Sequence, residues 1–509
     1  MANINQVTKE LVRDIELAIK FSGDKTNKSQ NLTSTASNLA FIYEKARNAV
    51  EFRDENLVRI AAVERILKRR IFLNQDNSKI AKLLIKELSW AKYLVNNVVE
   101  NEKIEQLSKI ISKYREAVKT SDSKNTREII TICACEIEDN LNFNPINQVI
   151  INYVSSSIFN KIDFNEPDKT IKSIQIYIAV EKTFAKNSDD IISYKLLKVL
   201  LPNWSDPNKF LKTYEIVKNH LNHPLKDLIK RKVNQLIPPF NLIRDLIKEN
   251  PEFIKLISDD TKLELAATKL LEEKYTQTKD KVIRASKRSI IYIFLTKMIL
   301  AIIIEIPFEI LFSHLNYVVL AINILFPPSL MILFNSSVKL PSKRNTQDMV
   351  EQVYNWLYLD SDKNIPENIV ENKILGKSDK TFFYIFLFTS ILMILGILWF
   401  LTILGFSFIS QIIFLFFLSV VSFFAFRVRE ISKEYQLHDS YNESFFETLM
   451  DYIFLPIIKI GQLLSNQISK INILSFIFDF IIEAPLKTFL EILEDWLHFV
   501  RVKKEEILS

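Results

Sequence analysis

Two glutamates and a proline interrupt an otherwise apolar run. Glu305, Pro307 and Glu309 lie in KMILAIIIEIPFEILF, residues 297–312. Residues four apart on a helix share a face with Cβ atoms about 6 Å apart, so each carboxylate disfavours ionisation of the other. Pro307 has no N–H and leaves the carbonyl of Ile303 without its helical partner. The three residues are therefore a candidate site for a proton or a cation.

The alternative for these residues is structural. Pro307 would kink the helix, and both carboxylates would reach the outer interface or pair inside a helix bundle. On an insertion scale the apolar side chains contribute about −7 kcal/mol, against about +3 kcal/mol for each central charge. We therefore expect Lys297 to extend toward the inner surface and Glu309 to reach the outer headgroups. If the two glutamates are structural, Glu305→Gln should be neutral or stabilising, because a charge leaves a costly environment.

A second candidate is the basic stretch RIAAVERILKRR at residues 59–70. Its charges could contact anionic lipid headgroups or an acidic partner. The alternative is a solvated helix face whose apolar side chains pack inward. No aromatic platform accompanies the charges, which argues against nucleic acid. The candidate residues are Arg59, Arg65, Lys68, Arg69 and Arg70.

The residues that common enzymes need are not present in a recognisable pattern. With 5 glycines in the chain, phosphate-binding loops, the dinucleotide fingerprint and the hydrolase elbow are all missing. No H-E-x-x-H motif occurs, and His220 and His223 have no carboxylate cluster beside them. Cys133 and Cys135 point to different sides of a helix and could not readily bridge. We expect a non-enzyme with no catalytic residues, metal or cofactor.

The elements that must position these residues are helices. Apolar side chains recur at spacings of three and four residues through much of residues 1–280, which predicts an all-α region. One such stripe contains Ile104, Leu107, Ile111, Tyr114 and Val118. Residues 121–126, SDSKNT, could divide the region into two subdomains. The N-terminal residues fit an amphipathic helix rather than a secretory signal.

The remaining chain alternates between apolar and charged segments. Four apolar runs approach or exceed the ~20 residues that cross a bilayer as a helix. They predict two transmembrane hairpins, at residues 281–335 and 381–426, joined by a loop at 336–380. Residues 427–509 read as amphipathic helices at the inner membrane surface, and 445–482 as either interfacial or re-entrant.

The distribution of basic residues predicts the orientation. If the chain forms two hairpins, every basic flank falls on one side, and the turns at 313–316 and near Gly405 contain no lysine or arginine. Cytoplasmic loops are the ones enriched in these residues. We expect a multi-pass protein of the inner (cell) membrane with both termini and the 336–380 loop in the cytoplasm. The flanking residues are Lys279, Lys281, Arg284, Lys287, Arg288, Lys339, Lys343, Arg344, Lys373, Lys377, Lys380, Arg427 and Arg429.

These features lead to two functional hypotheses. The first is a non-enzymatic membrane-anchored protein whose cytoplasmic helical domain binds a protein partner or organises the inner membrane face. The alternative is an ion or proton transporter or channel that uses Glu305 and Glu309. Only Gln411 is notably polar in the last two apolar runs, so a transport path would require a homo-oligomer. The expected partners are the lipid bilayer and an unknown protein, and nucleic acid is not expected.

Overall fold

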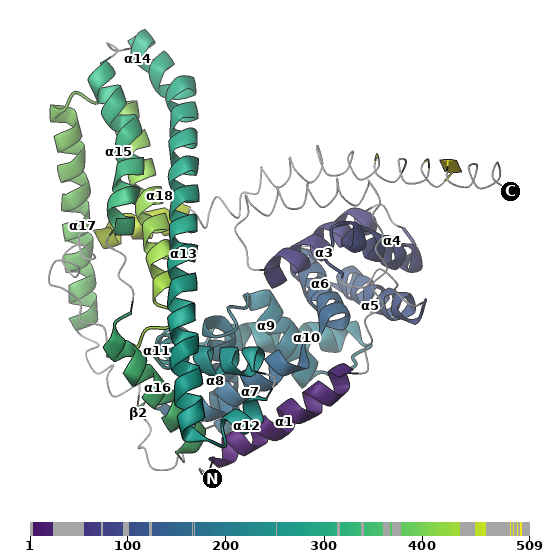
Figure 1. The fold of residues 1–509 in the computed structure, drawn as a ribbon. Coiled ribbons are helices and arrows are strands. Elements are labelled where there is room, and N and C mark those ends of the chain that lie inside the picture. The colour runs from purple at the N-terminus through teal and green to yellow at the C-terminus, as the bar shows by residue number, and fades with distance from the viewer. Residues whose placement is uncertain are drawn as a thin grey trace. The chain divides into compact units, whose positions relative to one another are not determined.

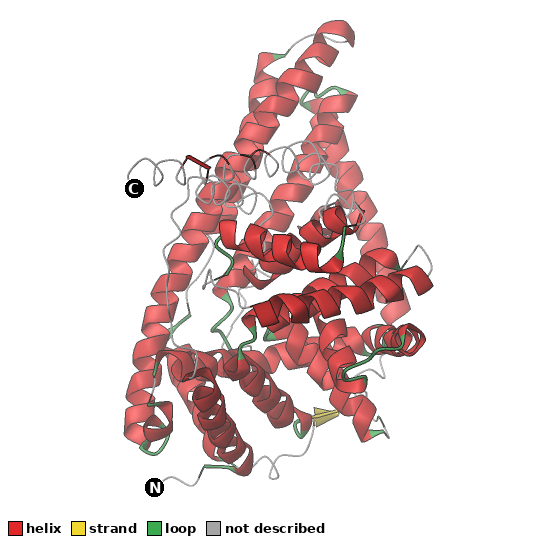
Figure 2. Cartoon of the chain, turned by 90° about the vertical axis from the view of Figure 1, so that its right-hand side faces the viewer, coloured by secondary structure: helices red, strands yellow, loops and turns green. Residues whose placement is uncertain are grey.

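Helices make up almost all of the described chain (Figures 1 and 2). The structure is a computed structural model. It describes residues 4–23, 55–72, 75–94, 101–121, 125–164, 166, 168–250, 252–312, 316–336, 341–359, 367–368, 378–437, 454–464, 489, 492, 496, 499 and 500. Two short strands, β1 (Ile162–Asp163) and β2 (Glu367–Asn368), pair in parallel. The predicted all-α class is confirmed apart from this pair.

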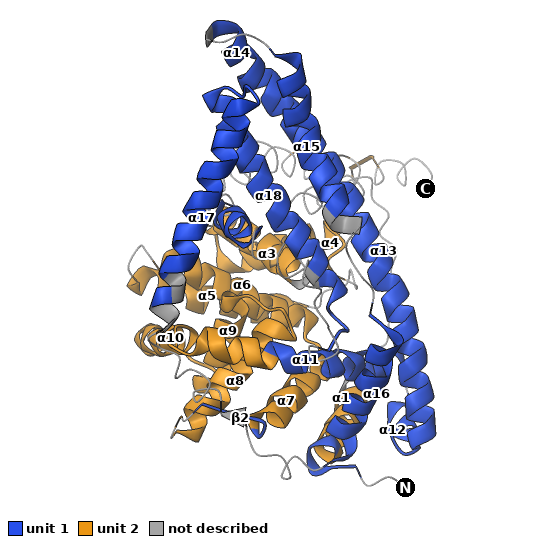
Figure 3. Cartoon of the chain, turned by 90° about the vertical axis from the view of Figure 1, so that its left-hand side faces the viewer, with its two compact units in different colours: residues 1–8, 160–165, 234–472 blue, residues 9–159, 166–233, 473–509 orange. Residues whose placement is uncertain are grey.

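The chain divides into two compact units, which Figure 3 colours separately. Unit 1 consists of residues 1–8, 160–165 and 234–472, and unit 2 of residues 9–159, 166–233 and 473–509. The boundary expected at residue 280 falls inside one uninterrupted helix of unit 1. The expected domain boundaries stay a prediction.

Unit 2 is built from helices that share a hydrophobic core. The apolar stripe predicted around residue 111 is the buried face of α5, where Leu107, Ile111 and Tyr114 are at most 3% exposed. The same core contains residues of α6, so it includes both sides of the 121–126 segment. The helices of unit 2 are α3 (Glu55–Phe72), α4 (Asn77–Trp90), α5 (Asn101–Thr120), α6 (Thr126–Asn142), α7 (Pro145–Phe159), α8 (Lys169–Thr183), α9 (Asp189–Leu200) and α10 (Pro207–Leu221), and all but α7 contribute to this core.

Two further helices begin in one unit and continue in the other: α1 (Gln6–Gly23) and α11 (Lys226–Glu249). The amphipathic pattern predicted for the N-terminus is present in α1, where Leu11, Ile15 and Ala18 are buried. Aspartate side chains cap α4, α8 and α10 of unit 2. Asp206 caps α10 by accepting a hydrogen bond from Asn208 N, with Pro207 in the first turn. The N-cap of this helix is therefore Asp206, and the helix begins at Pro207.

Unit 1 contains the long apolar helices. The first is α13 (Asp260–Leu300), which at 1.5 Å per residue is about 60 Å long and continues through a π-helical turn, η1 (Ala301–Glu305), into α14 (Ile306–Phe312). The other helices of the unit are α12 (Phe253–Leu256), α15 (Tyr317–Ser336), α16 (Lys343–Tyr358), α17 (Ser378–Ile403) and α18 (Phe408–Ser432).

Three of the described helices are long and apolar enough to cross a membrane. They are 260–311, which contains α13 and α14, then 384–403 in α17 and 408–429 in α18. The apolar part of α15, Tyr317–Leu333, is shorter. Many large apolar side chains of these helices are exposed, Trp399 at 68% and Ile303 at 66% among them. A chain with such a surface is suited to association with a membrane.

Side chains of α13, α15 and α18 form the core of the apolar bundle. Residues 454–464 add a short helix whose Ile457 joins this core. A Cβ at Gly461 would lie 2.1 Å from Ser419 O, so only glycine permits this close approach to α18. Most of the predicted amphipathic region 427–509, including most of 445–482, lies outside the described residues, and its membrane-surface location stays a prediction.

Candidate functional site

A buried ion pair lies where the π-helical turn interrupts the first apolar helix. The ammonium group of Lys297 pairs with Glu305 Oε1, and both side chains are 0% exposed. Asn323 of α15 donates a hydrogen bond of 2.9 Å to Glu305 Oε2. The ring of Phe417 on α18 lies 5.0 Å from Lys297 Nζ. Each carboxylate oxygen of Glu305 therefore has a partner.

The π-helical turn helps to explain how two residues eight apart meet. In a regular α-helix they are about 80° away from a common face, since each residue adds about 100°. The backbone N–H of Ile306 instead bonds to Ala301 O, five residues back. This wider turn takes up the excess rotation and brings Lys297 and Glu305 to one face. Pro307 follows at once and has no N–H to continue the α-helical pattern.

Glu309 lies one turn further along, in α14, and has a different environment. Ser410 of α18 donates a hydrogen bond of 2.9 Å to its Oε1. The residue is 4% exposed, and its Oε2 is buried with no hydrogen-bond partner among the residues that the structure describes. Asn323 Oδ1 is likewise buried with no partner in the described part of the chain. The two glutamates predicted as one site are thus held by different helices.

The structure corrects two expectations about this region. Lys297 does not extend to the inner surface, because its whole side chain is buried against Glu305. Glu309 does not reach an outer interface, because it is buried beside Ser410. Pairing inside a bundle is the arrangement found for Glu305.

Sequence reasoning missed Asn323 and Ser410 as members of the site. The signal that could have found them is a polar residue inside an apolar run. In the sequence that signal indicated Gln411, which lies next to Ser410. The amide of Gln411 bonds to Thr402 Oγ1 and Phe406 O and contacts neither carboxylate. Asn323 is flanked by Ile322 and Ile324, so its position marks a buried hydrogen bond between apolar helices.

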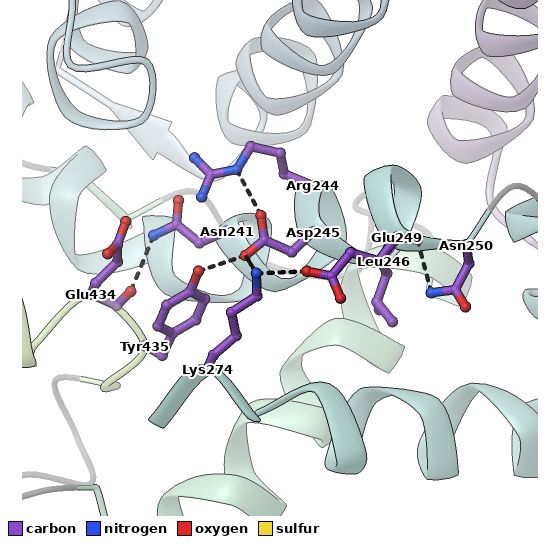
Figure 4. Close-up of polar contacts among 9 residues, drawn as sticks. All are labelled: Asn241, Arg244, Asp245, Leu246, Glu249, Asn250, Lys274, Glu434 and Tyr435. Carbon is purple, nitrogen blue, oxygen red and sulfur yellow. Dashed lines mark hydrogen bonds and ion pairs between the residues drawn. The ribbon is translucent and has the colours of Figure 1, made fainter. Parts of the chain in front are cut away.

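A second polar cluster, which we call the polar clamp, holds the segment that follows α18. It comprises Asn241, Arg244, Asp245 and Glu249 of α11, Lys274 and Tyr275 of α13, Asn345 of α16, and residues 434–437. Asp245 is its centre (Figure 4). Its Oδ2 accepts a 2.5 Å hydrogen bond from the Tyr435 hydroxyl and lies 3.5 Å from Lys274 Nζ, and its Oδ1 lies 3.1 Å from Arg244 Nε.

The backbone after α18 is fixed by two asparagines of the clamp. Asn241 donates to Glu434 O at 3.1 Å. Asn345 donates to Tyr435 O at 2.9 Å and accepts from the N–H of Leu437 at 2.9 Å. Burial, with the charge of Asp245, raises the pKa of Tyr435, so the phenol stays a neutral donor. Helices α11 and α16 thus anchor the segment that follows α18.

The basic stretch of residues 59–70 lies on α3, where acidic side chains neutralise part of its charge. Arg59 pairs with Glu138 of α6 at 2.5 Å, and Glu87 of α4 pairs with Arg69 at 2.5 Å and Arg70 at 2.8 Å. Lys68 pairs with Glu64 of the same helix. Val63, Ile66 and Leu67 pack into the core of unit 2, and the Nε of Arg65 is buried.

These pairs hold α3 against α4 and α6. Contact of Arg59, Arg65, Lys68, Arg69 and Arg70 with a lipid or a partner stays a prediction.

Other reactive side chains of the described chain lie in structural positions. Cys133 and Cys135 are buried free thiols on α6, and burial raises the pKa of each well above its usual value. A thiol in that state is a poor nucleophile. Within the described ranges, no three His, Cys, Asp or Glu residues are placed to hold a metal ion.

Comparison with known proteins gives no further constraint. No protein family, curated protein or solved structure matches the chain.

Proposed function

We propose that this protein is a non-enzymatic membrane anchor that holds a helical domain at the cytoplasmic face, where that domain binds a protein partner. The main support for a structural rather than a transport role is the pairing of Lys297 with Glu305 inside the apolar bundle. A carboxylate whose two oxygens both have internal partners stabilises the arrangement of helices. This role requires no exchange of ions with the solvent.

In the proposed topology, four helices cross the membrane as two hairpins. The first hairpin consists of the apolar end of α13 with α14, followed by α15, and the second consists of α17 and α18. The basic flanks then share one side with both termini and the 336–380 loop, which the positive-inside rule assigns to the cytoplasm. The 41-residue helix α13 begins at Asp260 on that side, so a rigid element would connect the membrane bundle to the cytoplasmic part.

An exposed apolar patch on unit 2 supports the partner-binding role. Phe143 follows α6 and is 51% exposed, and Val199 and Leu200 at the end of α9 are 76% and 41% exposed. Lys198 Nζ lies 5.2 Å from the Phe143 ring, which places the ends of the two helices together. Exposed apolar side chains at two neighbouring helix ends favour a protein-binding surface.

One observation favours a second candidate, transport of protons or cations. Within the described ranges Glu309 Oε2 is buried without a hydrogen-bond partner, and intramembrane carboxylates often lie on ion pathways. A transporter would conduct protons or cations when purified, whereas an anchor would not.

Fractionation tests anchoring. The full chain should stay in the membrane pellet after extraction with alkaline carbonate, and a chain ending at residue 278 should be released as a folded α-helical protein. Cysteine labelling tests orientation once the buried Cys133 and Cys135 are replaced. Ser342→Cys should react only after the cells are opened, and Ser407→Cys should react in intact cells. Labelling of Ser342→Cys from outside would overturn the topology.

Site-specific photo-crosslinking tests partner binding. A photoreactive residue at Val199 should give a discrete adduct in cells, and the same residue at exposed Lys212 on α10 serves as the matched control. Equal labelling at both positions, or none at Val199, would contradict a partner at the apolar patch.

A further inference from the structure

One exposed face of α13 changes from basic to apolar as the helix enters the apolar bundle. Arg284 and Arg288 are exposed on this face and lie four residues apart. Lys281 and Lys287 are exposed on either side of them. Tyr292 follows Arg288 by four residues and is 58% exposed. At about 100° per residue, these five side chains lie within about 140° of the helix circumference, so they form one continuous surface.

The apolar part of this face is exposed as well. Ile291 and Leu295 are 60% and 53% exposed, and each follows one of the two arginines by seven residues, which is close to two helical turns. The opposite side of α13 packs into the core of the bundle, where Val282 is 6% and Ile293 is 1% exposed. The face that changes from basic to apolar therefore lies opposite the side that packs against α15 and α18.

The charge and the hydrogen-bonding groups of this face suit a phosphate group. Residues 279–296 contain five basic side chains and one acidic one, Asp280. The positive-inside rule requires basic residues near the end of a span and places no condition on the face they occupy. Here Arg284, Arg288 and Tyr292 form a row that leads to the exposed apolar side chains. Guanidinium groups bind phosphate oxygens through two parallel hydrogen bonds, and interfacial tyrosines lie at headgroup level.

We propose that this face of α13 binds an anionic phospholipid of the cytoplasmic leaflet. Arg284 and Arg288 contact the phosphate, and Tyr292 contacts the glycerol backbone. Ile291 and Leu295 lie along an acyl chain. The row from Arg284 to Leu295 is about 16 Å long, which is less than the thickness of one leaflet, about 20 Å, so a single lipid molecule reaches all of it. The inference rests on the proposed membrane topology and deepens it, because it gives the anchor a preferred class of lipid.

Photo-labelling in vesicles tests the proposal. The full-length protein is reconstituted in phosphatidylcholine vesicles with a trace of either phosphatidylglycerol or phosphatidylcholine that has a photoreactive acyl chain. Trypsin then releases the peptide that ends at Lys297 and contains the apolar part of the face, and mass spectrometry measures its lipid adduct. We expect about tenfold more adduct with the anionic lipid, since each basic residue near a headgroup contributes on this order. Equal labelling by the two lipids would overturn the proposal.

Two matched variants isolate the arginines. In Arg284→Gln, Arg288→Gln both lipids should label the peptide equally, which also reports that the helix is still in the bilayer. The control Lys230→Gln, Arg231→Gln removes the same number of positive charges from exposed positions of α11 and should keep the preference. A preference that survives in the first variant, or that is lost in the control, would show that this face does not select the lipid.

Two further outcomes separate this proposal from its alternatives. Excess soluble glycerophosphate should leave the labelling unchanged, because it has no acyl chain to contact the apolar part of the face. A loss of labelling would assign the site to a soluble phosphate compound and overturn the lipid assignment. If neither lipid labels peptides of α13, α17 or α18, the anchoring proposal itself fails. If both lipids label all three helices without preference, anchoring stands and only the lipid site is refuted.

Discussion

The helix α13 supplies a lysine to each of two carboxylate pairs, and the two pairs have opposite environments. Lys297 meets Glu305, which is four residues from Glu309. Lys274 meets both Asp245 and Glu249, which are also four apart on one helix. The first group lies in the apolar bundle and the second in the polar clamp.

The difference lies in the number of cations and in access to water. In the clamp, Lys274 bridges both carboxylates and Arg244 adds a second cation to Asp245, while the Glu249 side chain is 43% exposed. In the bundle one ammonium serves one carboxylate, and both are 0% exposed. The same residue types thus form a partly solvated network with several partners in the polar clamp, and a fully buried pair with a single cation in the apolar bundle.

The largest effect should come from breaking the buried pair on one side only. Lys297→Met leaves Glu305 charged or forces it to take up a proton, and loss of one partner of a buried pair costs about 3–5 kcal/mol. Unfolding of the protein in mixed micelles by added denaturing detergent would measure the loss. The double variant Lys297→Met, Glu305→Gln should recover most of the stability, and a double variant as unstable as the single one would contradict the pairing.

A smaller effect is expected from the centre of the clamp. Asp245→Asn weakens the acceptor of Tyr435 and removes the counter-charge of Arg244 and Lys274, for a loss of about 1–3 kcal/mol. The same unfolding assay measures it, and limited proteolysis after α18 should become faster as residues 434–437 are released. Tyr435→Phe is the matched control, with a loss of about 1 kcal/mol. A loss from Tyr435→Phe larger than that from Asp245→Asn would show that the hydroxyl has another essential partner.

The smallest effect should be at the exposed end of the clamp. Glu249→Gln should cost about 0–1 kcal/mol, as is usual for an exposed ion pair. Its coupling to Lys274, measured by a double-mutant cycle, should decrease as salt is raised toward 1 M, where the screening length is about 3 Å. The Lys297–Glu305 coupling should not change with salt. A salt-sensitive coupling in the bundle would mean that water reaches the pair.

The periodicity of apolar residues predicted the helices well, because each stripe must be buried against another helix. Leu107, Ile111 and Tyr114 illustrate this in unit 2. The same principle identified the apolar runs, since a helix of sufficient length is recognisable without knowing its neighbours. Packing of α13, α15 and α18 against one another depends on long-range contacts that no local pattern encodes.

The sequence predicted the two glutamates of the candidate site but not the side chains that bind them. Glu305 and Glu309 stand out in an apolar run, whereas Asn323 and Ser410 come from helices that only the fold brings near. The spacing of Lys297 and Glu305 does not suggest a pair, because a π-helical turn is needed to align them. If Glu305 had no cation beside it, Glu305→Gln would be neutral or stabilising, as expected from the sequence. Because Lys297 pairs with Glu305, the same change instead leaves a buried ammonium group without its counter-ion.

Proton flux is the measurement that tests the account most directly. The purified protein in liposomes containing a pH-sensitive dye would be compared with empty liposomes and with the Lys297→Met, Glu305→Gln variant, under a proton gradient and a membrane potential. If the buried pair is structural and the protein is an anchor, all three should show the same slow leak. Wild-type protein that conducts protons, with the flux lost in the double variant, would contradict the account and establish the transport alternative.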